Sequence, residues 1–157
     1  MKIAVVSDIH YPKRLFSFPN VLGALTNFDL VIGLGDYVHS DVIDFIRSVS
    51  KKSFFVSGNA DESFIKSYYP PKLLLNIEGI SIGVIHGYGS PNNLSKRLLS
   101  EFQKIDLLLY GHSHIVDDDI IAGTRVLNPG AFCETQSIGI LSIKNGQIEN
   151  WSVECLN

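Results

Sequence analysis

The sequence predicts an α/β fold in which central β-sheets are flanked by helices, because two kinds of segment alternate along the chain. Continuous apolar runs, typical of strands buried on both faces, lie at residues 3–6, 30–34, 53–57, 80–85 and 105–109. Segments with helical spacing of apolar residues lie between several of these runs. Beyond Gly111 short alternating strands are expected, with turn signals at Gly123-Thr124 and Asn145-Gly146.

Three helices are expected between the strands. The clearest spans residues 40–49, where Ser40 is suited to cap the first turn. A second amphipathic helix is expected at 92–105, where apolar residues recur every three or four positions. Residues 20–27, after Pro19, show a weaker helical pattern. These helices would cover the faces of the sheets.

Length and composition indicate a single domain spanning residues 1–157. A chain of 157 residues buries roughly 70% of the surface that its unfolded form exposes. The apolar fraction of 45% is ordinary for a globular protein, and no repeat or linker divides the chain.

The formal net charge of −3 does not suit a surface that neutralises many backbone phosphates, so polymeric nucleic acid is not an expected partner.

The two cysteines and the N-terminal segment indicate a cytoplasmic protein. Cys133 and Cys155 lack the short paired spacing of a zinc or redox motif, and we expect both to be reduced, structural thiols. Asp8 interrupts the first apolar run too early for a signal peptide, and no run approaches the ~20 apolar residues of a membrane span. No membrane partner is therefore expected.

Polar side chains able to bind metal follow five of the predicted strands. They are Asp8, His10, Asp36, Asn59, His86, His112 and His114, and they include four of the five histidines in the chain. Ligands bind at the carboxyl ends of strands in α/β sheets, because successive loops converge there. If these side chains were only structural, each would need its own hydrogen-bond partner at the end of an apolar run. Their co-occurrence favours one shared site.

This donor set predicts a dinuclear transition-metal centre. Oxygen and imidazole donors without thiolate suit Mn²⁺, Fe²⁺, Zn²⁺, Co²⁺ or Ni²⁺ better than Ca²⁺ or Mg²⁺. Seven ligands are too many for one such ion but suit two ions that share a carboxylate. Two-metal sites of this kind hydrolyse phosphate esters, since they acidify a water and clamp the attacking and leaving oxygens.

The order of motifs, SDIH, GDY, GNAD, HG and GHSH, resembles that of the calcineurin-like metallophosphoesterases. The short length resembles the small prokaryotic YfcE-type phosphodiesterase branch. The resemblance runs from Asp8 to Gly130 and implies a four-layer arrangement of sheets and helices. It also implies two divalent ions, for which we expect manganese, with nickel, cobalt, iron or zinc as alternatives.

The resemblance also implies a role for each candidate ligand. Asp8, His10 and His114 would hold the first metal ion. Asn59, His86 and His112 would hold the second ion. Asp36 would bridge the two ions, and with Asn59, His86 and His112 it forms the predicted catalytic set. Gly35, Gly58, Gly87 and Gly111 adjoin these ligands, where the lack of a Cβ would allow tight turns and close approach, although ordinary strand-end turns are an alternative for each.

The sequence departs from the family pattern at Ala60. Many members carry a histidine there that contacts the phosphate and assists the leaving group, help that is typically worth 10² to 10⁴ in rate. Asp61 is retained, and it would either orient a ligand histidine or hold a loop. His39 could reach the substrate, but we favour a role in starting the helix. The acidic run 117–119 is expected to form a solvated turn.

The predicted function is hydrolysis of a small phosphodiester by a metal-bridging hydroxide, with phosphomonoester hydrolysis as a close variant. A protein-interaction scaffold is the alternative, because the same fold serves in the retromer complex as a subunit with a degraded site.

The NPGA run at 128–131 is expected to shape a loop near the metals. The substrate pocket is expected to be lined by residues 11–18, Tyr37, Tyr68, Tyr69 and residues 88–92. A homo-oligomer is possible.

Overall fold

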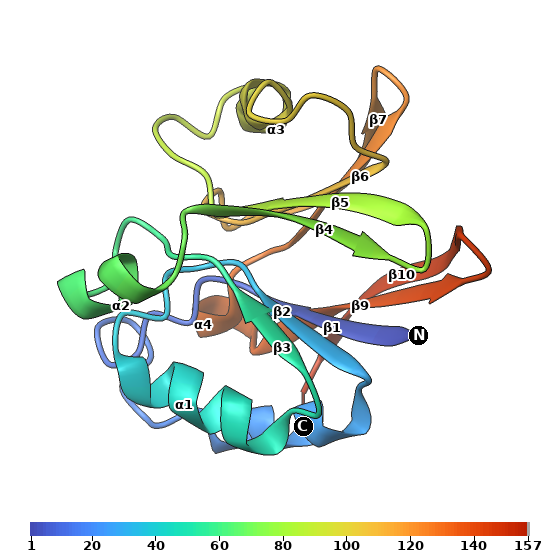
Figure 1. Cartoon of the computed structure of the whole chain (residues 1–157). Helices are drawn as coiled ribbons and strands as arrows, with labels where there is room; N and C mark the ends of the chain where they lie inside the picture. The colour runs from blue at the N-terminus through green and yellow to red at the C-terminus, as the bar shows by residue number, and fades with distance from the viewer. Residues whose placement is uncertain (157) are drawn as a thin grey trace.

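The computed structural model describes residues 1–156, and its strands form two five-stranded sheets stacked face to face (Figure 1). The first sheet has the strand order β10 (Gln147–Cys155), β9 (Ser137–Lys144), β1 (Lys2–Val6), β2 (Leu30–Gly33) and β3 (Ser53–Phe55). The second has the order β4 (Lys72–Ile77), β5 (Ile80–Ile85), β6 (Leu107–Tyr110), β8 (Thr124–Pro129) and β7 (Val116–Ile121). The predicted β9–β10 hairpin is present, with antiparallel pairing.

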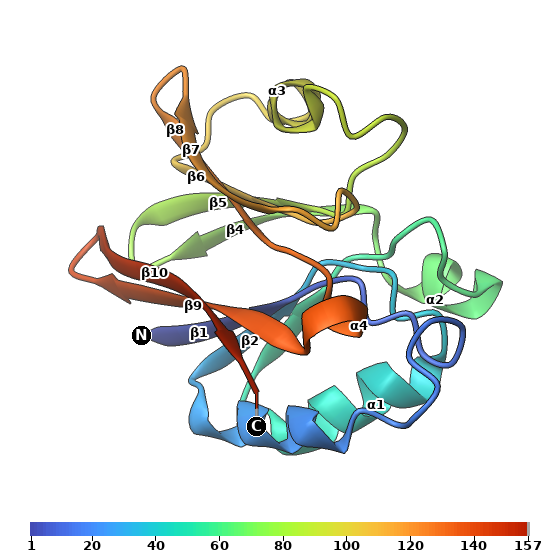
Figure 2. The same cartoon turned by 180° about the vertical axis from the view of Figure 1, so that it is seen from behind.

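Helices cover the outer faces of both sheets, so the fold has four layers. The 3₁₀ helix η1 (Asn20–Asn27) and α1 (Ser40–Val49) lie against the first sheet, and α3 (Leu94–Leu99) lies over the second (Figures 1 and 2). Two short helices, α2 (Ser63–Tyr68) and α4 (Phe132–Thr135), follow strand ends. The predicted α/β architecture with flanking helices, and the four layers implied by the resemblance, are confirmed.

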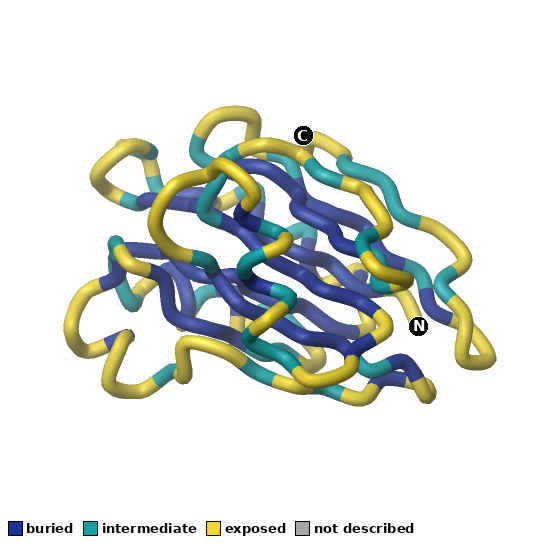
Figure 3. The backbone as a smooth tube through the Cα atoms, turned by 90° about the horizontal axis from the view of Figure 1, so that it is seen from above, coloured by how far each residue is buried: buried dark blue, intermediate teal, exposed yellow. Residues whose placement is uncertain are grey.

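The alternation of side chains along β1 shows why these strands are apolar on both faces. Ile3 and Val5 belong to the core between the two sheets, whereas Ala4 and Val6 belong to the core under the helices, with Ile46 of α1. A third cluster joins α3 to the second sheet. Burial is accordingly concentrated in the strands, and the exposed residues gather in the loops (Figure 3).

Parallel pairing brings the carboxyl ends of the central strands to one edge of the molecule. In the first sheet β1 pairs with β2 and β2 with β3 in parallel, and in the second β5 pairs with β6 and β6 with β8 in parallel. The loops that leave these strands therefore meet, which provides the framework for a site.

Several predicted elements differ from those observed. The helix expected at 92–105 is only Leu94–Leu99, because the backbone then tightens into turns with three-residue spacing, such as Phe102 N–H to Leu99 O at 3.2 Å. The strands expected at 53–57 and 105–109 are Ser53–Phe55 and Leu107–Tyr110. Strand β4 and helix α2 were not predicted. The apolar run of β4 is only Leu73 to Leu75, between Lys72 and Asn76, and α2 is only six residues long.

Two local predictions are also corrected. His39, not Ser40, caps α1, because its Nδ1 accepts a hydrogen bond from the Asp41 N–H at 3.3 Å. The acidic run 117–119 is not a turn but part of β7, which pairs with β8. There Asp118 binds Arg125 at 2.9 Å, so this run is held by strand pairing and an ion pair.

Candidate metal centre

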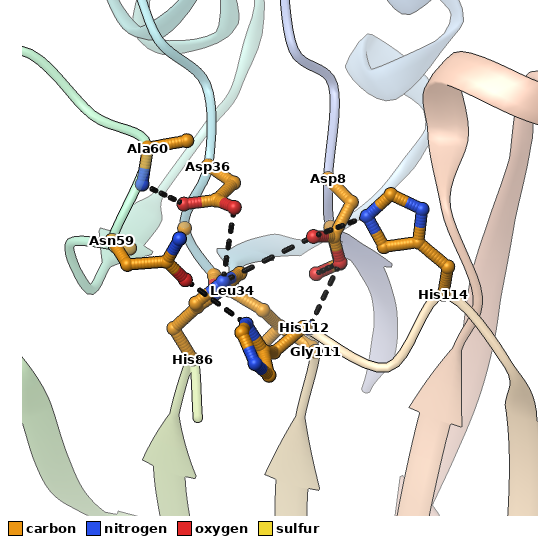
Figure 4. A network of polar contacts seen from close by, with 12 residues as sticks. Asp8, Leu34, Asp36, Asn59, Ala60, His86, Gly111, His112 and His114 are labelled. Carbon is orange, nitrogen blue, oxygen red and sulfur yellow. Dashed lines mark hydrogen bonds and ion pairs between the residues drawn. The ribbon is translucent and has the colours of Figure 1, made fainter. Parts of the chain in front are cut away.

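The loops after five strands bring the candidate ligands together at one edge of the sheets. The side chains come from the segments that follow β1, β2, β3, β5 and β6, and Figure 4, which labels all of them except His10, shows the labelled ones pointing toward a common centre. All seven lie there: Asp8, His10, Asp36, Asn59, His86, His112 and His114. His39 is not among them, since its ring caps α1.

Asp8, His10 and His114 form one group with metal-ligand geometry. Oδ1 of Asp8 lies 3.6 Å from Nε2 of His10 and 3.2 Å from Nε2 of His114. Their ligand atoms all lie within 4.8 Å of one another, so a single ion between them would reach all three. This is the group that the resemblance associates with the first ion.

Asp36 lies between this group and His86. Its Oδ2 is 3.5 Å from Nε2 of His10 and 3.2 Å from Nε2 of His86. Asp8, Asp36 and His86 also form a group within 4.8 Å, since Oδ1 of Asp8 lies 4.0 Å from Nε2 of His86. A carboxylate in this position can serve ions on both sides.

Asn59 and His112 lie together on the far side of the centre. Nδ1 of His112 is 2.9 Å from Oδ1 of Asn59, and its Nε2 is 2.8 Å from the carbonyl oxygen of Gly89. The ring is thereby held with Nδ1 toward the centre. The rings of His86 and His112 are also in edge-on contact, with centroids 5.3 Å apart.

Unpartnered buried atoms in residues 1–156 show that the centre fits a cation. Oδ1 of Asp8, Nε2 of His10 and Nε2 of His86 are buried without a hydrogen-bond partner, although buried polar atoms are normally paired. The 3.2 Å approach of His86 to Asp36 is an ion-pair distance without hydrogen-bond geometry. Nδ1 of His86 contacts the Leu34 carbonyl at 2.7 Å, which leaves Nε2 as a ligand. Divalent ions would satisfy these atoms.

The charges of the centre favour bound positive charge. Burial opposes the ionisation of Asp8, but its contacts with His10 and His114 hold the Asp8 pKa well below its usual range. The contact with Asp8 raises the pKa of His114 to about 9 against partial burial, with Glu134 adding to it. Burial opposes protonation of His86, yet the facing Asp36 and Asp8 raise its pKa. A divalent ion would replace these protons.

Backbone strain is concentrated at the same residues. Five of the seven candidate ligands have positive φ angles between 51° and 68°, a region that residues other than glycine rarely adopt: Asp8, His10, Asp36, His112 and His114. Such strain costs about 1–3 kcal/mol per residue and is typical of functional sites. The fold therefore holds these side chains in directions that ordinary strand ends would not give.

Two of the predicted glycines are required by close approach. A Cβ on Gly58 would collide with the carboxylate and backbone nitrogen of Asp36, and a Cβ on Gly111 would collide with the hydroxyl of Ser7. These contacts support the close-approach interpretation over an ordinary turn at both positions.

Asp61 holds the loops of the centre rather than a histidine. Its carboxylate accepts hydrogen bonds from the backbone N–H groups of Gly58 at 2.7 Å, Val38 at 2.7 Å and Asp36 at 3.2 Å. Of the two roles considered, the structure supports the loop role. Asn128 of the NPGA run is fully buried and donates to the Gly111 carbonyl at 3.1 Å, so this run shapes the adjacent loop as expected.

Glu134 is a component of the site that sequence reasoning missed. Its Oε1 lies 2.8 Å from Nδ1 of His114, on the side of the ring opposite Asp8. The backbone places it there, because Cys133 N–H donates to Asp8 O at 3.0 Å at the start of α4. The only sequence signal was its position five residues after Pro129, beside the NPGA run.

Two cavities adjoin the centre and share Asn59. The smaller cavity, of about 260 Å³, is lined by Lys13, Arg14 and Ala60 with five of the candidate ligands. The larger cavity, of about 470 Å³, reaches Asn59 and His86 from the side of Lys66 and Tyr88. Tyr37, expected in the pocket wall, is fully buried with its hydroxyl accepting from Gly35 N–H, and does not line either cavity.

Fold and site together define a metallophosphoesterase. The family model of the calcineurin-like phosphoesterase superfamily domain matches residues 1–146, and the chain belongs to this superfamily. A probable metallophosphoesterase of Methanocaldococcus jannaschii is 35% identical over 153 residues, which cover 92% of this chain and 77% of the relative. A solved Thermotoga maritima protein is 37% identical, with 99% of each chain covered and a TM-score of 0.81.

More distant solved structures share the fold. Vps29 of Chaetomium thermophilum is 17% identical with a TM-score of 0.81, covering 98% of this chain and 96% of its own. An archaeal phosphodiesterase is 22% identical with a TM-score of 0.73, and the match covers 98% of this chain and 100% of that protein. Among residues 1–156, no helix is both long and apolar enough to cross a membrane.

Proposed function

We propose that the chain is a hydrolase of small phosphodiesters that works with two divalent metal ions, manganese being the expected metal. The observation that carries this proposal is the convergence of three buried, unpartnered ligand atoms, from Asp8, His10 and His86, beside the Asp36 carboxylate. Such ions supply Lewis-acid activation of the phosphate and a water that is acidic at neutral pH.

The metal ligands are assigned as part of this proposal. Asp8, His10 and His114 hold one ion, and Asn59, His86 and His112 hold the other. Asp36 is shared, in keeping with its position between His10 and His86. Leu34 and Glu134 orient the rings of His86 and His114 through their second nitrogens, so that each Nε2 faces the centre.

The two cavities support a small ester substrate. The smaller cavity contacts most of the ligands, which suits the reacting phosphate. The larger cavity falls within the roughly 300–1,000 Å³ of pockets that bind drug-sized ligands, and it is reached from Asn59. It would accommodate the ester substituent. The solved archaeal phosphodiesterase with the same fold agrees with a diester substrate.

Metal analysis combined with turnover of a chromogenic phosphodiester tests the proposal. We expect bound metal after purification, hydrolysis that increases on addition of Mn²⁺, and loss of hydrolysis after exhaustive chelation. A chromogenic monoester measured in parallel defines the ester preference. Full activity in a chain from which all metal has been removed would contradict the two-metal proposal.

A protein-interaction scaffold is the second candidate, and Ala60 is the observation that favours it. Position 60 lines the smaller cavity with a methyl group only, so the site lacks one donor to a phosphate. The fold is also that of Vps29. A chain that binds Mn²⁺ but hydrolyses neither monoester nor diester would favour the scaffold over the enzyme.

A further inference from the structure

Two cations face the candidate metal centre from the loop after β1. Lys13 and Arg14 line the smaller cavity together with Ala60 and five of the candidate ligands. Within residues 1–156, neither side chain forms an ion pair or a hydrogen bond. By contrast, Arg125 is paired with Asp118 and Lys72 with Glu101. These two cations are therefore available to an anion in the cavity.

The backbone fixes this loop to the centre. The N–H groups of Arg14 and Leu15 both donate to the carbonyl oxygen of His10, at 2.8 and 3.3 Å. Tyr11 forms an isolated parallel bridge with Val38, and its ring packs edge-on against Phe18, with centroids 5.3 Å apart. A turn that begins at a candidate ligand thus carries Arg14, so the backbone of Arg14 is held beside His10 and its side chain starts within reach of the cavity.

Size and charge indicate what the smaller cavity takes. At about 260 Å³ it is below the usual range for drug-sized ligands, which suits a phosphate group rather than a whole ester. Asp8 and Asp36 would be neutralised by bound divalent ions, so Lys13 and Arg14 would leave the cavity positive. The planar guanidinium fork matches two phosphate oxygens, a geometry that a lysine ammonium does not reproduce.

We propose that Arg14, with Lys13 beside it, binds the non-bridging oxygens of the substrate phosphate and so provides the contact that Ala60 lacks. This inference rests on the proposed function, because it places the reacting phosphate between these cations and the metal ligands. Arg14 is then a residue that touches the substrate, supplied from the loop after the first strand instead of from position 60.

Binding of inorganic phosphate to the manganese-loaded full chain, measured by calorimetry, tests this assignment without turnover. We expect Arg14→Ala to weaken phosphate binding about tenfold or more, since hydrogen bonds to charged groups are worth roughly that factor. Arg14→Lys should lie between Arg14→Ala and wild type, because it keeps the charge and loses the fork. Lys13→Ala should have a smaller effect of about threefold, as expected for a charge without the fork.

Lys144→Ala is the matched control, because it also removes one positive charge but lies at the end of β9, outside both cavities. It should bind phosphate like wild type, and metal content should be equal in all variants. Should Arg14→Ala misfold, Arg14→Gln, which keeps the side chain's approximate length, takes its place. Phosphate affinity in the Arg14 variants equal to that of Lys144→Ala would overturn the inference.

Diester hydrolysis by the same samples separates this inference from the proposed function. A wild-type chain that binds phosphate through Arg14 but hydrolyses no phosphoester would contradict the proposed function and leave the inference standing. A wild-type chain that hydrolyses diesters, with an Arg14→Ala variant that still binds phosphate normally, would contradict the inference alone.

Discussion

The carboxylate of Glu134 lies 2.8 Å from Nδ1 of His114, and Oδ1 of Asp8 lies 3.2 Å from the other ring nitrogen. A carboxylate behind a metal-binding histidine fixes the orientation of the ring and strengthens it as a ligand. Glu134 is largely exposed, with 54% of its side chain accessible, so its role depends on this contact rather than on packing.

From this contact we expect Glu134→Ala to weaken binding of the metal ion assigned to Asp8, His10 and His114 about 10- to 100-fold, the usual effect of losing such a partner. Glu134→Gln keeps an acceptor and should lose less. Metal titration by calorimetry measures both, with Glu154→Ala as a control at an exposed carboxylate of β10. Equal metal affinity in Glu134→Ala and wild type would show that the contact has no role in the centre.

Asp36 and His39 should differ sharply in importance although they are three residues apart. Asp36→Asn should reduce kcat/KM for a diester by at least about a hundredfold, because a neutral amide bridges two cations poorly. His39→Ala should leave kcat/KM nearly unchanged and only lower stability slightly, since His39 caps α1 at 3.3 Å. Steady-state kinetics with thermal melts check this ranking, which fails if the two variants are equally inactive.

Replacing Ala60 with His should favour substrates with poor leaving groups. Ala60 lines the smaller cavity, and its N–H donates to Asp36 at 2.7 Å, so an imidazole there would face the phosphate. A histidine with a pKa near neutrality can protonate a departing alkoxide, which is worth up to about 10² to 10⁴ in rate, whereas nitrophenyl groups leave without such help.

The measurement for Ala60→His is kcat/KM for an alkyl and a nitrophenyl diester in both proteins at equal metal occupancy. The ratio of the two values should shift toward the alkyl diester. Misplacement of the ring by about 1 Å can cost a hundredfold, so the ratio, rather than the absolute rate, is decisive. A ratio that does not move would count against position 60 as the site of a missing acid.

The stability of the metal-free chain should fall as pH rises from about 6.5 to 9. Contact with Asp8 raises the pKa of His114 from 6.5 to about 9, so the folded chain holds a proton that the unfolded chain releases in this range. A histidine whose pKa is raised by folding stabilises the folded chain fully at pH values below its unfolded pKa. This stabilisation is lost as the pH rises through its folded pKa. The raised pKa of His86 acts in the same direction.

Urea unfolding after chelation, repeated across this pH range, measures the effect. His114→Gln should show a shallower decline, because it cannot bind the proton, and the metal-loaded wild type should not follow the same profile. A metal-free wild type whose stability is constant or rises from pH 6.5 to 9 would show that Asp8 and His114 are not coupled as the structure indicates.

The sequence alone predicted most of the strands and the place of the ligands, because both are encoded by neighbouring residues. The run at 3–6 is apolar at every position since both faces of β1 are covered, and polar residues begin where the strand ends, at Ser7 and Asp8. Asp36 and His86 were found by the same rule, because each follows the end of a buried apolar strand. The ordered set of motifs was sufficient to predict the family.

Side-chain direction and distant contacts were decided only by the tertiary structure. Strand β4 has only the short apolar run Leu73 to Leu75, with Leu74 exposed, so its pairing with β5 reveals it but its sequence does not. Tyr37 is buried beneath the centre and His39 turns away to cap α1, although both follow Asp36. Glu134 reaches His114 from twenty residues away because Cys133 N–H is bonded to Asp8 O. Such relations depend on how separate elements pack, and a local sequence pattern carries no information about that packing.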